Sequence, residues 1–566
     1  MRLRFALWLL SACLLAHQAL AREPQRARYG MVVAMEGQAA AVGADVLRRG
    51  GNAVDAAVAV GFALAVTQPN AGNIGGGGYM LLRMADGRSS FIDFRERAPA
   101  AAARDMYLDA TGEATRGSIE GWRAVGVPGT VRGLAMALGQ YGTWAWGDTL
   151  QPAISLAQQG YVVSPAQAKH LQSAKNLATN TESRRVFQRD GRFFAAGERL
   201  QQPNLAATLS RLVAHGPDEF YTGATGRQLA RAMRENGGLI SEADLRDYRA
   251  IERPPLQGSY KGYTLLTAPP SSSGGVVILQ TLGMLEGTAF AAGGQGSASV
   301  IHWLAEAMRR SYADRNAYLG DPDFVTPPVA GLLDRSYLAQ RRAGIDPKQA
   351  TPSATLKAGT PEGVEREQTT HYTVVDAAGN AVAVTYTLNG YFGNGITVPG
   401  LGFLLNNEMD DFAARRDTPN MFGLVQGEAN AIAPGKRPLS SMSPTIVLKE
   451  GKLYMTLGAP GGSRIPSAVL QTFVNVVDFG LNLQDAVDSP RMHHQWLPDR
   501  LYLERGISPD TAELLKNRGH AISQSPGVVL AAVSAIRLHD GWIEGAPDGR
   551  SADSRAIGLD EPPAAR

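Results

Sequence analysis

A threonine stands where a loop-like stretch of the chain gives way to a strand-like one. Thr369 precedes the alternating run 370–375 and follows residues 341–368, which are rich in Pro, Gly, Thr and charge. A Thr hydroxyl is a poor nucleophile unless a base stands beside it, and its own α-amine becomes that base if the chain is cut before it. Because an α-amine titrates at about pH 7.7–8.0, a useful neutral fraction exists near pH 7. The pattern predicts a self-cleaving chain with Thr369 as nucleophile.

The residues around Thr369 indicate how it would be presented. Residues 341–368 read as an exposed, flexible linker, and 370–375 and 381–388 read as two strands joined by a turn at 376–380. A nucleophile at the head of a strand, behind a cleavable linker, suggests an N-terminal-nucleophile hydrolase. The linker and the two strands alone are equally compatible with an ordinary hairpin that follows a surface loop.

Further polar motifs follow Thr369 in a fixed order. They are Thr-Tyr-Thr-Leu-Asn at 385–389, Leu-Leu-Asn-Asn-Glu-Met-Asp-Asp-Phe at 404–412, Lys-Arg-Pro-Leu-Ser-Ser-Met-Ser-Pro-Thr at 436–445 and Gly-Ala-Pro-Gly-Gly-Ser-Arg at 458–464. The first half adds Gly-Gly-Gly-Gly-Tyr-Met at 75–80, Asp-Phe-Arg-Glu at 93–96, Gly-Val-Pro-Gly-Thr at 126–130 and Tyr-Ala-Asp-Arg at 312–315. Together these motifs closely resemble the γ-glutamyltranspeptidase family (glutathione hydrolases) over nearly the whole mature chain.

The resemblance implies an α+β fold, the four-layer αββα sandwich of N-terminal-nucleophile hydrolases. This fold is built as one globule from two autocleaved segments. The cut would fall between Gln368 and Thr369, giving a large subunit at 22–368 and a small subunit at 369–566. Because neither segment carries a complete core, the two are expected to stay together as a heterodimer.

Local patterns predict individual elements. Two helices are expected within 37–67, broken at Gly50-Gly51, and others at 299–318, at 467–479 and from Ser508-Pro509 to near Gly519. Strand pairs are expected at 80–83 with 90–94, 445–449 with 452–457, and 528–538 with 542–543.

The resemblance also implies catalytic roles. Thr369 would attack the γ-carbonyl of a γ-glutamyl amide such as glutathione, and water or an amino acid or peptide acceptor would resolve the resulting γ-glutamyl-enzyme ester. Thr387 matches the position whose hydroxyl hydrogen-bonds the nucleophile, although a strand Thr can also make a routine cross-strand contact. The backbone N–H groups of Gly461 and Gly462 would stabilise the oxyanion, because glycine lets the backbone approach closely.

The two charged ends of the glutamyl group need opposite partners. A guanidinium fork, aided by two serines, would bind the α-carboxylate, while an amide and two carboxyl groups would surround the α-ammonium. In that order the residues are Arg95, Ser440, Ser441, Asn389, Glu408 and Asp411. Taken singly, Arg95 could be a surface ion pair and 408–411 a solvated helical edge.

Residues 413–434 resemble the lid loop of bacterial members of the family. Where those enzymes often carry Tyr, this chain has Phe422. Phe keeps the ring but lacks the hydroxyl and its hydrogen bond, which is worth about 0.5–1.5 kcal/mol. We therefore expect a looser lid and an altered balance between hydrolysis and transfer.

The N-terminus reads as a secretory signal peptide. Arg2 and Arg4 precede an apolar stretch at 5–16, and Ala-Leu-Ala at 19–21 offers a cleavage site after Ala21. This predicts a periplasmic or secreted protein. A lipoprotein box at 10–13 would instead anchor the protein through Cys13, which is the only cysteine. If the leader is removed, disulfides, cysteine nucleophiles and thiolate metal sites are excluded.

Composition excludes other functions. The formal net charge is +3, and without a Lys/Arg block nucleic-acid binding has no electrostatic basis. The longest apolar run, 56–66, is shorter than the ~20 residues of a membrane span. His493 and His494 lack a metal-binding frame, so they are expected to pack or hydrogen-bond. The sequence therefore predicts no metal, no cofactor and no transmembrane helix in the mature chain.

Two other functions stay open beside the γ-glutamyl hydrolase and transferase. A glutaryl or cephalosporin acylase of the same superfamily would cut an amide that lacks the α-amino group, leaving Asn389, Glu408 and Asp411 without a partner. A non-catalytic γ-glutamyl-binding protein would need neither Thr369 nor the glycine pair at 461–462.

Overall fold

The computed structural model describes residues 22–356, 369–415, 418–524 and 529–564. The expected leader at 1–21 and the residue before the expected cut, Gln368, lie outside these ranges. Within them, every helix is too short or too polar to cross a membrane.

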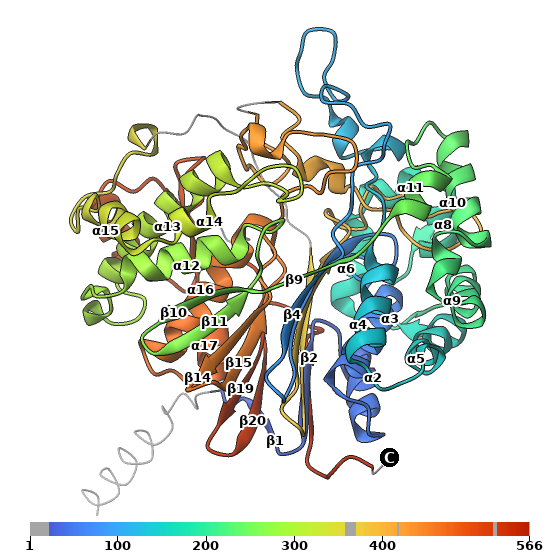
Figure 1. Cartoon of the computed structure of the whole chain (residues 1–566), viewed down its shortest axis with the longest axis horizontal. Coiled ribbons are helices and arrows are strands. Elements are labelled where there is room, and N and C mark those ends of the chain that lie inside the picture. The colour runs from blue at the N-terminus through green and yellow to red at the C-terminus, as the bar shows by residue number, and fades with distance from the viewer. Residues whose placement is uncertain (1–21, 357–368, 416–417, 525–528, 565–566) are drawn as a thin grey trace, which may run out of the picture.

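Two seven-stranded sheets, each antiparallel throughout, form the centre of the molecule (Figure 1). The first has the order β1 (Gln25–Ala27), β20 (Trp542–Pro547), β19 (Ser534–His539), β15 (Lys452–Gly458), β14 (Thr445–Lys449), β11 (Tyr263–Thr267), β10 (Leu256–Tyr260). The second has the order β21 (Arg555–Leu559), β2 (Gly30–Ala34), β12 (Thr370–Asp376), β13 (Ala381–Thr387), β3 (Gly77–Arg83), β4 (Ser89–Asp93), β9 (Ile251–Arg253).

The two sheets face each other, and side chains alternate between them and the helices outside. In β2, Met31 and Val33 belong to the core shared with the first sheet, whereas Val32 packs with the helices on the other face. The hydroxyls of Thr373 in β12 and Thr456 in β15 meet across the interface at 2.9 Å. Successive strand residues point to opposite faces, so odd-numbered residues of β12 face the first sheet.

Helices cover both outer faces, which gives four layers (Figure 1). Against the second sheet lie α2 (Gly37–Arg48), α3 (Ala53–Thr67), α4 (Thr130–Tyr141), α5 (Trp146–Gln159) and α9 (Pro203–His215). Against the first sheet lie α12 (Gly274–Leu285), α13 (Ala298–Tyr318), α16 (Ile465–Val477) and α17 (Leu483–Asp488). Every residue of α3 is buried, and Asn52 starts it with a capping box, as suits an apolar helix between layers.

Shorter elements lie around this sandwich. The helices are α6 (Pro165–Ser173), α7 (Lys175–Thr179), α8 (Thr181–Phe187), α10 (Ala224–Glu235), α11 (Glu242–Asp247), α14 (Val329–Leu332), α15 (Arg335–Ala343) and α18 (Pro509–Asn517). The strands are β5 (Tyr161–Val162), β6 (Gln188–Arg189), β7 (Arg192–Phe193), β8 (Arg199–Leu200), β16 (Met492–His493), β17 (Leu501–Leu503) and β18 (Ile522–Ser523).

The expected αββα sandwich is confirmed, and most local predictions agree with it. The break at Gly50-Gly51 separates α2 from α3, with Gly50 at φ 84°, a conformation that glycine adopts without strain. The helices expected at 299–318, 467–479 and 509–519 correspond to α13, α16 and α18 within two residues. The expected strand pairs at 80–94 and 445–457 are β3 with β4 and β14 with β15.

Two predictions of local structure are wrong in part. The strand expected from residue 528 begins only at Ser534, because Ala531 has φ 62° and its carbonyl accepts a hydrogen bond from Arg491 at 2.9 Å. The linker expected from residue 341 begins inside α15, and Ser353 is fully buried with its backbone N–H bound to Asp499 at 2.7 Å. Residues 350–356 therefore dock on the globule, and 357–368 lie outside the described ranges.

Three buried histidines are held neutral. Nδ1 of His302 in α13 and Nε2 of His520 are 2.8 Å apart and share a hydrogen bond. Burial lowers the pKa of His302, and it lowers the pKa of His520 to about 3 and that of His494 to about 4. In the unfolded chain these groups take up a proton near pH 6.5. Because the folded pKa values are depressed, the stabilisation is complete above pH 6.5 and is lost as the pH falls.

We expect the thermal midpoint to fall as the pH drops from 6.5 toward 5. In His520→Gln, the slope of unfolding free energy against pH should be smaller by up to about 1.4 kcal/mol per pH unit, one proton's worth. His539→Gln, at an exposed position, is the control and should keep the wild-type slope. Equal slopes in wild type and His520→Gln would contradict the assignment.

Candidate active site

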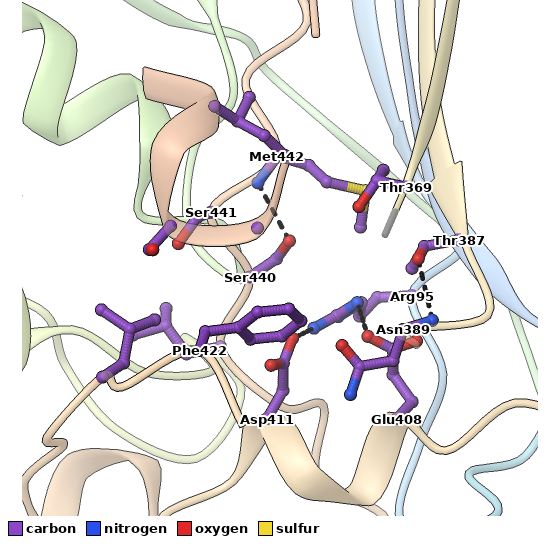
Figure 2. A pocket seen from close by; sticks show the side chains of 15 residues that line it. Arg95, Thr369, Thr387, Asn389, Glu408, Asp411, Phe422, Ser440, Ser441 and Met442 are labelled. Atoms are coloured by element: carbon purple, nitrogen blue, oxygen red, sulfur yellow. Dashed lines mark hydrogen bonds and ion pairs between the residues drawn. The ribbon is translucent and has the colours of Figure 1, made fainter. Parts of the chain in front are cut away.

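Strand pairing places Thr369 at the end of the cleft between the sheets. Thr370 pairs with Tyr386, and the same register extended by one residue sets Thr369 opposite Thr387. Thr369 shares the odd-numbered face of His371 and Thr373, which looks toward the first sheet. Thr369, the nucleophile predicted from the sequence, therefore stands beside Thr387 (Figure 2). At this point β12 pairs with β13, and the second sheet faces the first.

A small cavity opens in front of Thr369. It is lined by most of the site residues expected from the sequence, together with an apolar wall. The expected residues are Arg95, Thr369, Thr387, Asn389, Glu408, Asp411, Phe422, Ser440, Ser441 and Gly462, and the wall consists of Leu424, Leu439, Met442 and Ile465. Gly461 adjoins Gly462 just behind the lining. The structure thus brings together residues that lie more than 300 positions apart.

The chain after β13 turns sharply beside the nucleophile. The Thr387 hydroxyl accepts a hydrogen bond from the backbone N–H of Asn389 at 2.8 Å. Asn389 has φ 72°, a conformation that Asn tolerates better than most residues, and its amide donates to the carbonyl of Asn407 at 2.9 Å. These contacts fix both side chains at the rim of the cavity.

The glycine pair at 461–462 has the conformation expected of a close backbone approach. Gly461 has φ 136° and Gly462 has φ 51°, and a Cβ on Gly462 would lie 2.8 Å from the Phe422 ring. The pair precedes α16, so the positive end of that helix faces the same region. Backbone N–H groups presented this way can stabilise an oxyanion next to Thr369.

Arg95 lies at the centre of a buried charge cluster. Its two terminal nitrogens donate to Glu408 Oε1 and to Asp411 Oδ2, and its Nε donates to the Pro438 carbonyl at 3.2 Å. Arg95 follows β4, and the Tyr248 hydroxyl holds its backbone carbonyl at 2.8 Å. The guanidinium and both carboxyl groups are visible together in Figure 2.

Burial controls the protonation of this cluster. It raises the pKa of Glu408 well above the usual range, against the opposing charge of Arg95. Burial also raises the pKa of Asp411, while the charges of Arg95 and Arg315 act in the opposite direction. Burial by itself would lower the pKa of Arg95, but the charges of Glu408 and Asp411 outweigh burial and raise this pKa. Arg95 is therefore cationic at every pH at which the protein folds.

The two serines are held by the backbone of a neighbouring turn. The Ser440 N–H donates to the Ser271 carbonyl at 3.0 Å, and the Ser440 carbonyl accepts from the Ser273 N–H at 2.8 Å. Arg315 Nη2 lies 3.5 Å from the Ser441 hydroxyl. Both hydroxyls thus reach the cavity from a fixed main chain.

The lid segment is tied down at both ends of Phe422. Asn420 accepts the Phe422 N–H at 3.0 Å, and its amide donates to Asp411 Oδ1 at 3.2 Å. The Phe422 carbonyl accepts from Gln495 at 3.2 Å, and the Gln495 oxygen accepts from the Ser463 hydroxyl at 2.7 Å. The lid is thereby linked to an ammonium-site carboxylate on one side and to the glycine-pair loop on the other.

The sequence did not assign a role to several residues of this neighbourhood. Glu96 and Arg315 stand inside motifs that the resemblance uses, but nothing in the sequence showed that Glu96 lies close to Glu408 or Arg315 close to Ser441. Asn420 and Gln495 carried no recognisable signal. Their parts depend on contacts between segments that are distant in the chain.

His493 hydrogen-bonds as expected and is not exposed for metal binding. Its Nδ1 lies 2.7 Å from the Ser467 hydroxyl and its Nε2 lies 2.9 Å from Gln495 Oε1. Burial lowers its pKa to about 3. Among the described residues, no group of His, Cys, Asp and Glu side chains is arranged to hold a metal ion.

The fold and the site together define an N-terminal-nucleophile hydrolase with a threonine at the head of a central strand. The family described as Gamma-glutamyltranspeptidase matches residues 39–558. The chain belongs to this family.

Three relatives illustrate the range of similarity. The Glutathione hydrolase proenzyme of Escherichia coli (strain K12) is 48% identical over 539 residues, which is 94% of this chain and 93% of the relative. The Acylase ACY 1 proenzyme of Pseudomonas sp. (strain SE83) is 41% identical over 536 residues, 93% of each chain. The crystal structure of cephalosporin acylase from Bacillus halodurans superposes with a TM-score of 0.84 at 28% identity, covering 95% of this chain and 97% of that one.

The buried ion pairs of Arg95 predict a large loss of stability when its charge is removed. In Arg95→Met, Glu408 and Asp411 lose their cation, which should cost about 3–5 kcal/mol and lower the thermal midpoint. The loss should shrink as the pH falls, because the unpaired carboxyl groups can then take up protons. Arg88→Met, which breaks an exposed pair with Asp86 at 2.8 Å, should change the midpoint little. A midpoint for Arg95→Met close to that of Arg88→Met would contradict this role.

Proposed function

We propose that the chain is a self-processing γ-glutamyl hydrolase and transferase that cleaves the γ-glutamyl amide of glutathione and related compounds. The observation that carries the proposal is the single cavity that joins Thr369 to a guanidinium and two carboxyl groups. Such a site suits an amide whose acyl end is an α-amino acid. Membership of the γ-glutamyltranspeptidase family and the names of the glutathione hydrolase relatives support the same activity.

Maturation would begin with the Thr369 hydroxyl attacking the carbonyl carbon of Gln368. The acyl group moves from nitrogen to oxygen, and water then hydrolyses the ester. The products are a carboxylate on Gln368 and a free α-amine on Thr369. The proenzyme names of the relatives support this step. The two segments would remain a heterodimer because their strands share both sheets.

In the mature enzyme the Thr369 amine would act as the base for its own hydroxyl. The hydroxyl attacks the γ-carbonyl, and the N–H groups of Gly461 and Gly462 stabilise the oxyanion. Collapse expels the amine of the leaving group and leaves a γ-glutamyl ester on Thr369. Water resolves the ester to glutamate, whereas an amino acid or peptide amine resolves it to a new γ-glutamyl amide. No metal or cofactor takes part in this scheme.

Substrate recognition would proceed by exchange of ion pairs. The α-carboxylate of the substrate would replace Glu408 and Asp411 on the Arg95 guanidinium, with Ser440 and Ser441 adding donors. The α-ammonium would in turn replace Arg95 as the cation beside the two carboxyl groups, with the Asn389 oxygen as a further acceptor. A zwitterionic end group can make both replacements at once. A group with one charge would leave half of the cluster unpaired.

The acylase alternative rests on the names of two relatives, one of them at 41% identity. A glutaryl group lacks the α-ammonium, so its binding would take Arg95 away from Glu408 and Asp411 without supplying a cation in return. Leaving buried carboxylates unpaired is costly. The charge cluster therefore favours the γ-glutamyl substrate.

We also propose export of the protein. The leader at 1–21, cut after Ala21, would deliver the chain to the periplasm or the exterior. Lipid attachment through Cys13 is the alternative outcome, and the mass of the mature N-terminus distinguishes the two.

The first experiment is intact mass spectrometry with a parallel assay of p-nitroaniline release from γ-glutamyl p-nitroanilide. Wild type should yield two fragments that meet at Gln368 and Thr369, together with activity. Thr369→Ala should yield one uncut, inactive chain. Thr370→Ala, which alters the neighbouring hydroxyl that bonds Gln68 on the opposite face, should still be processed. A single uncut and inactive wild-type chain would overturn the mechanism and favour a non-catalytic binding protein.

An assay with glutaryl p-nitroanilide distinguishes a γ-glutamyl hydrolase from a glutaryl acylase. We expect kcat/KM for the γ-glutamyl compound to exceed that for the glutaryl compound by at least 100-fold, because only the former supplies the ammonium. A processed enzyme that prefers the glutaryl compound would instead be an acylase.

Because position 422 carries Phe and not Tyr, we expect a hydroxyl introduced there to affect the lid. Phe422→Tyr should add a latch hydrogen bond worth about 0.5–1.5 kcal/mol and change the ratio of transfer to hydrolysis, measured with glycylglycine as acceptor. Phe324→Tyr, at an exposed ring elsewhere, is the control. An unchanged ratio in Phe422→Tyr would count against the looser lid.

A further inference from the structure

Glu96 is a buried acid to which neither the fold nor the proposed reaction gives a task. Its side chain is fully buried, and within the described ranges neither carboxyl oxygen has a hydrogen-bond partner. Oε2 of Glu408 is likewise buried without a hydrogen-bond partner. A Cβ on Gly77 would lie 2.6 Å from Glu96 Oε2, so the group is wedged against the start of β3. An ionised carboxylate in such a place is costly unless it is neutralised.

The carboxyl groups of Glu96 and Glu408 both lie close to one nitrogen of Arg95. Nη1 of Arg95 donates to Glu408 Oε1 and lies 3.8 Å from Glu96 Oε2. Two carboxylates hold only acceptor oxygens, so they cannot bond to each other without a proton between them. Like charges at such close range do not both stay ionised, and the pair titrates as one unit.

The balance of charges around Glu96 and Glu408 favours one bound proton. The cations are Arg95 and Arg315, and burial lowers the Arg315 pKa only to about 10. The acids are Asp411, Glu408 and Glu96. Two buried phenols lie nearby: Tyr248, whose hydroxyl donates to the Arg95 carbonyl, and Tyr79, and burial raises the pKa of both well above 10. Two cations and three carboxyl groups are neutral when exactly one of the acids is protonated.

The protonation energetics agree with this count. Burial raises the pKa of Glu96 to about 7, against the charge of Arg95, and a proton held between Glu96 and Glu408 also acts to lower it. Burial is the largest cause that raises the pKa of Glu408. The charge of Glu96 and the proton held between the two groups raise this pKa further. The proton therefore belongs on Glu408, with Glu96 as its acceptor.

We propose that Glu96 is a positioning residue that shares one proton with Glu408 and thereby sets the orientation and the charge of the ammonium site. The inference rests on the proposed γ-glutamyl function and deepens it. The shared proton lies on the Oε2 side of Glu408, which leaves Oε1 free to turn from Arg95 to the substrate α-ammonium. The site then stays neutral when a zwitterion binds. Loss of the proton adds a negative charge that repels the substrate α-carboxylate.

Two substitutions at Glu96 separate this role from simple packing. Glu96→Ala leaves Glu408 Oε2 without a partner and should raise KM for γ-glutamyl p-nitroanilide at least tenfold, with a smaller change in kcat. Glu96→Gln has the same size and a permanently neutral N–H donor for Glu408, so it should recover most of that loss at pH 7. If Gln is as damaging as Ala although both proteins fold and are processed, the shared proton is wrong.

The pH profile gives a readout that packing would not change. In wild type, KM should rise between pH 7 and 9 as the pair loses its proton. In Glu96→Gln the rise should be at least threefold smaller, because no proton remains to be lost there. Asp314→Asn removes another buried carboxyl with a raised pKa, outside the cavity, and should keep the wild-type profile. Profiles of wild type and Glu96→Gln that run parallel would overturn the proposal.

Thermal stability tests the proton without any substrate. The folded pKa of Glu96 lies above the unfolded value, so its contribution is complete below about pH 4.3 and is lost as the pH rises toward 7. Wild type should therefore lose thermal stability relative to Glu96→Gln between pH 5 and 8. This comparison stays valid even if γ-glutamyl p-nitroanilide proves not to be a substrate, so the two proposals fail separately. A constant difference in midpoint across this range would contradict the shared proton.

Discussion

The pairing of β12 and β13 with strands from the N-terminal part of the chain is the constraint on which the rest of the structure depends. β12 pairs with β2 and β13 pairs with β3, so the hairpin that follows Thr369 is inserted into the middle of the second sheet. Backbone hydrogen bonds on both sides hold it there. A cut before Thr369 would leave all of these pairings intact, because none of them crosses residues 368–369. The same insertion keeps the nucleophile buried between the sheets, away from bulk water.

The site is assembled around that hairpin from three directions. Arg95 arrives from the end of β4, Glu408 and Asp411 from the segment after β13, and the glycine pair from the start of α16. Two guanidinium groups, Arg95 and Arg315, stand against three carboxyl groups, which is an unstable arrangement unless the charge is balanced by a proton or by a ligand. The cluster is therefore a structural ion pair in the free protein, and in the proposed reaction it would receive a zwitterion. A substrate that carries both charges can exchange with it at little electrostatic cost.

The lid and the oxyanion loop share contacts that make them one unit. The Phe422 ring lies against Gly462, while Gln495 bonds both the Phe422 carbonyl and the Ser463 hydroxyl. A movement of the lid would thus be felt at the glycine pair. This connection gives a physical reason why a residue of the lid, such as Phe422, can influence the fate of the ester and not only access to the cavity.

Much of the fold could be predicted from the sequence, and most of the residues expected at the site line one cavity. Glycine breaks, caps and strand alternation are local, so they delimited α2, α3 and the central hairpins, and the order of the motifs pointed to the family and to its αββα sandwich. Local signals failed where a distant partner decides the conformation. The carbonyl of Ala531 bonds Arg491 in place of a strand neighbour, and Ser353 docks through Asp499 where a free linker was expected.

The sequence by itself determined which side chains could do chemistry: a threonine before a strand, a glycine pair, one arginine, several acids and two serines. Only the tertiary structure decided that Arg95 lies between Glu408 and Asp411, that Asn420 and Gln495 tie the lid, and that Glu96 and Glu408 are buried close together. The reason is that charge and protonation depend on burial and on neighbours in space. Residues 96 and 408 become neighbours only when the segments that carry them, which follow β4 and β13, are packed into one sandwich.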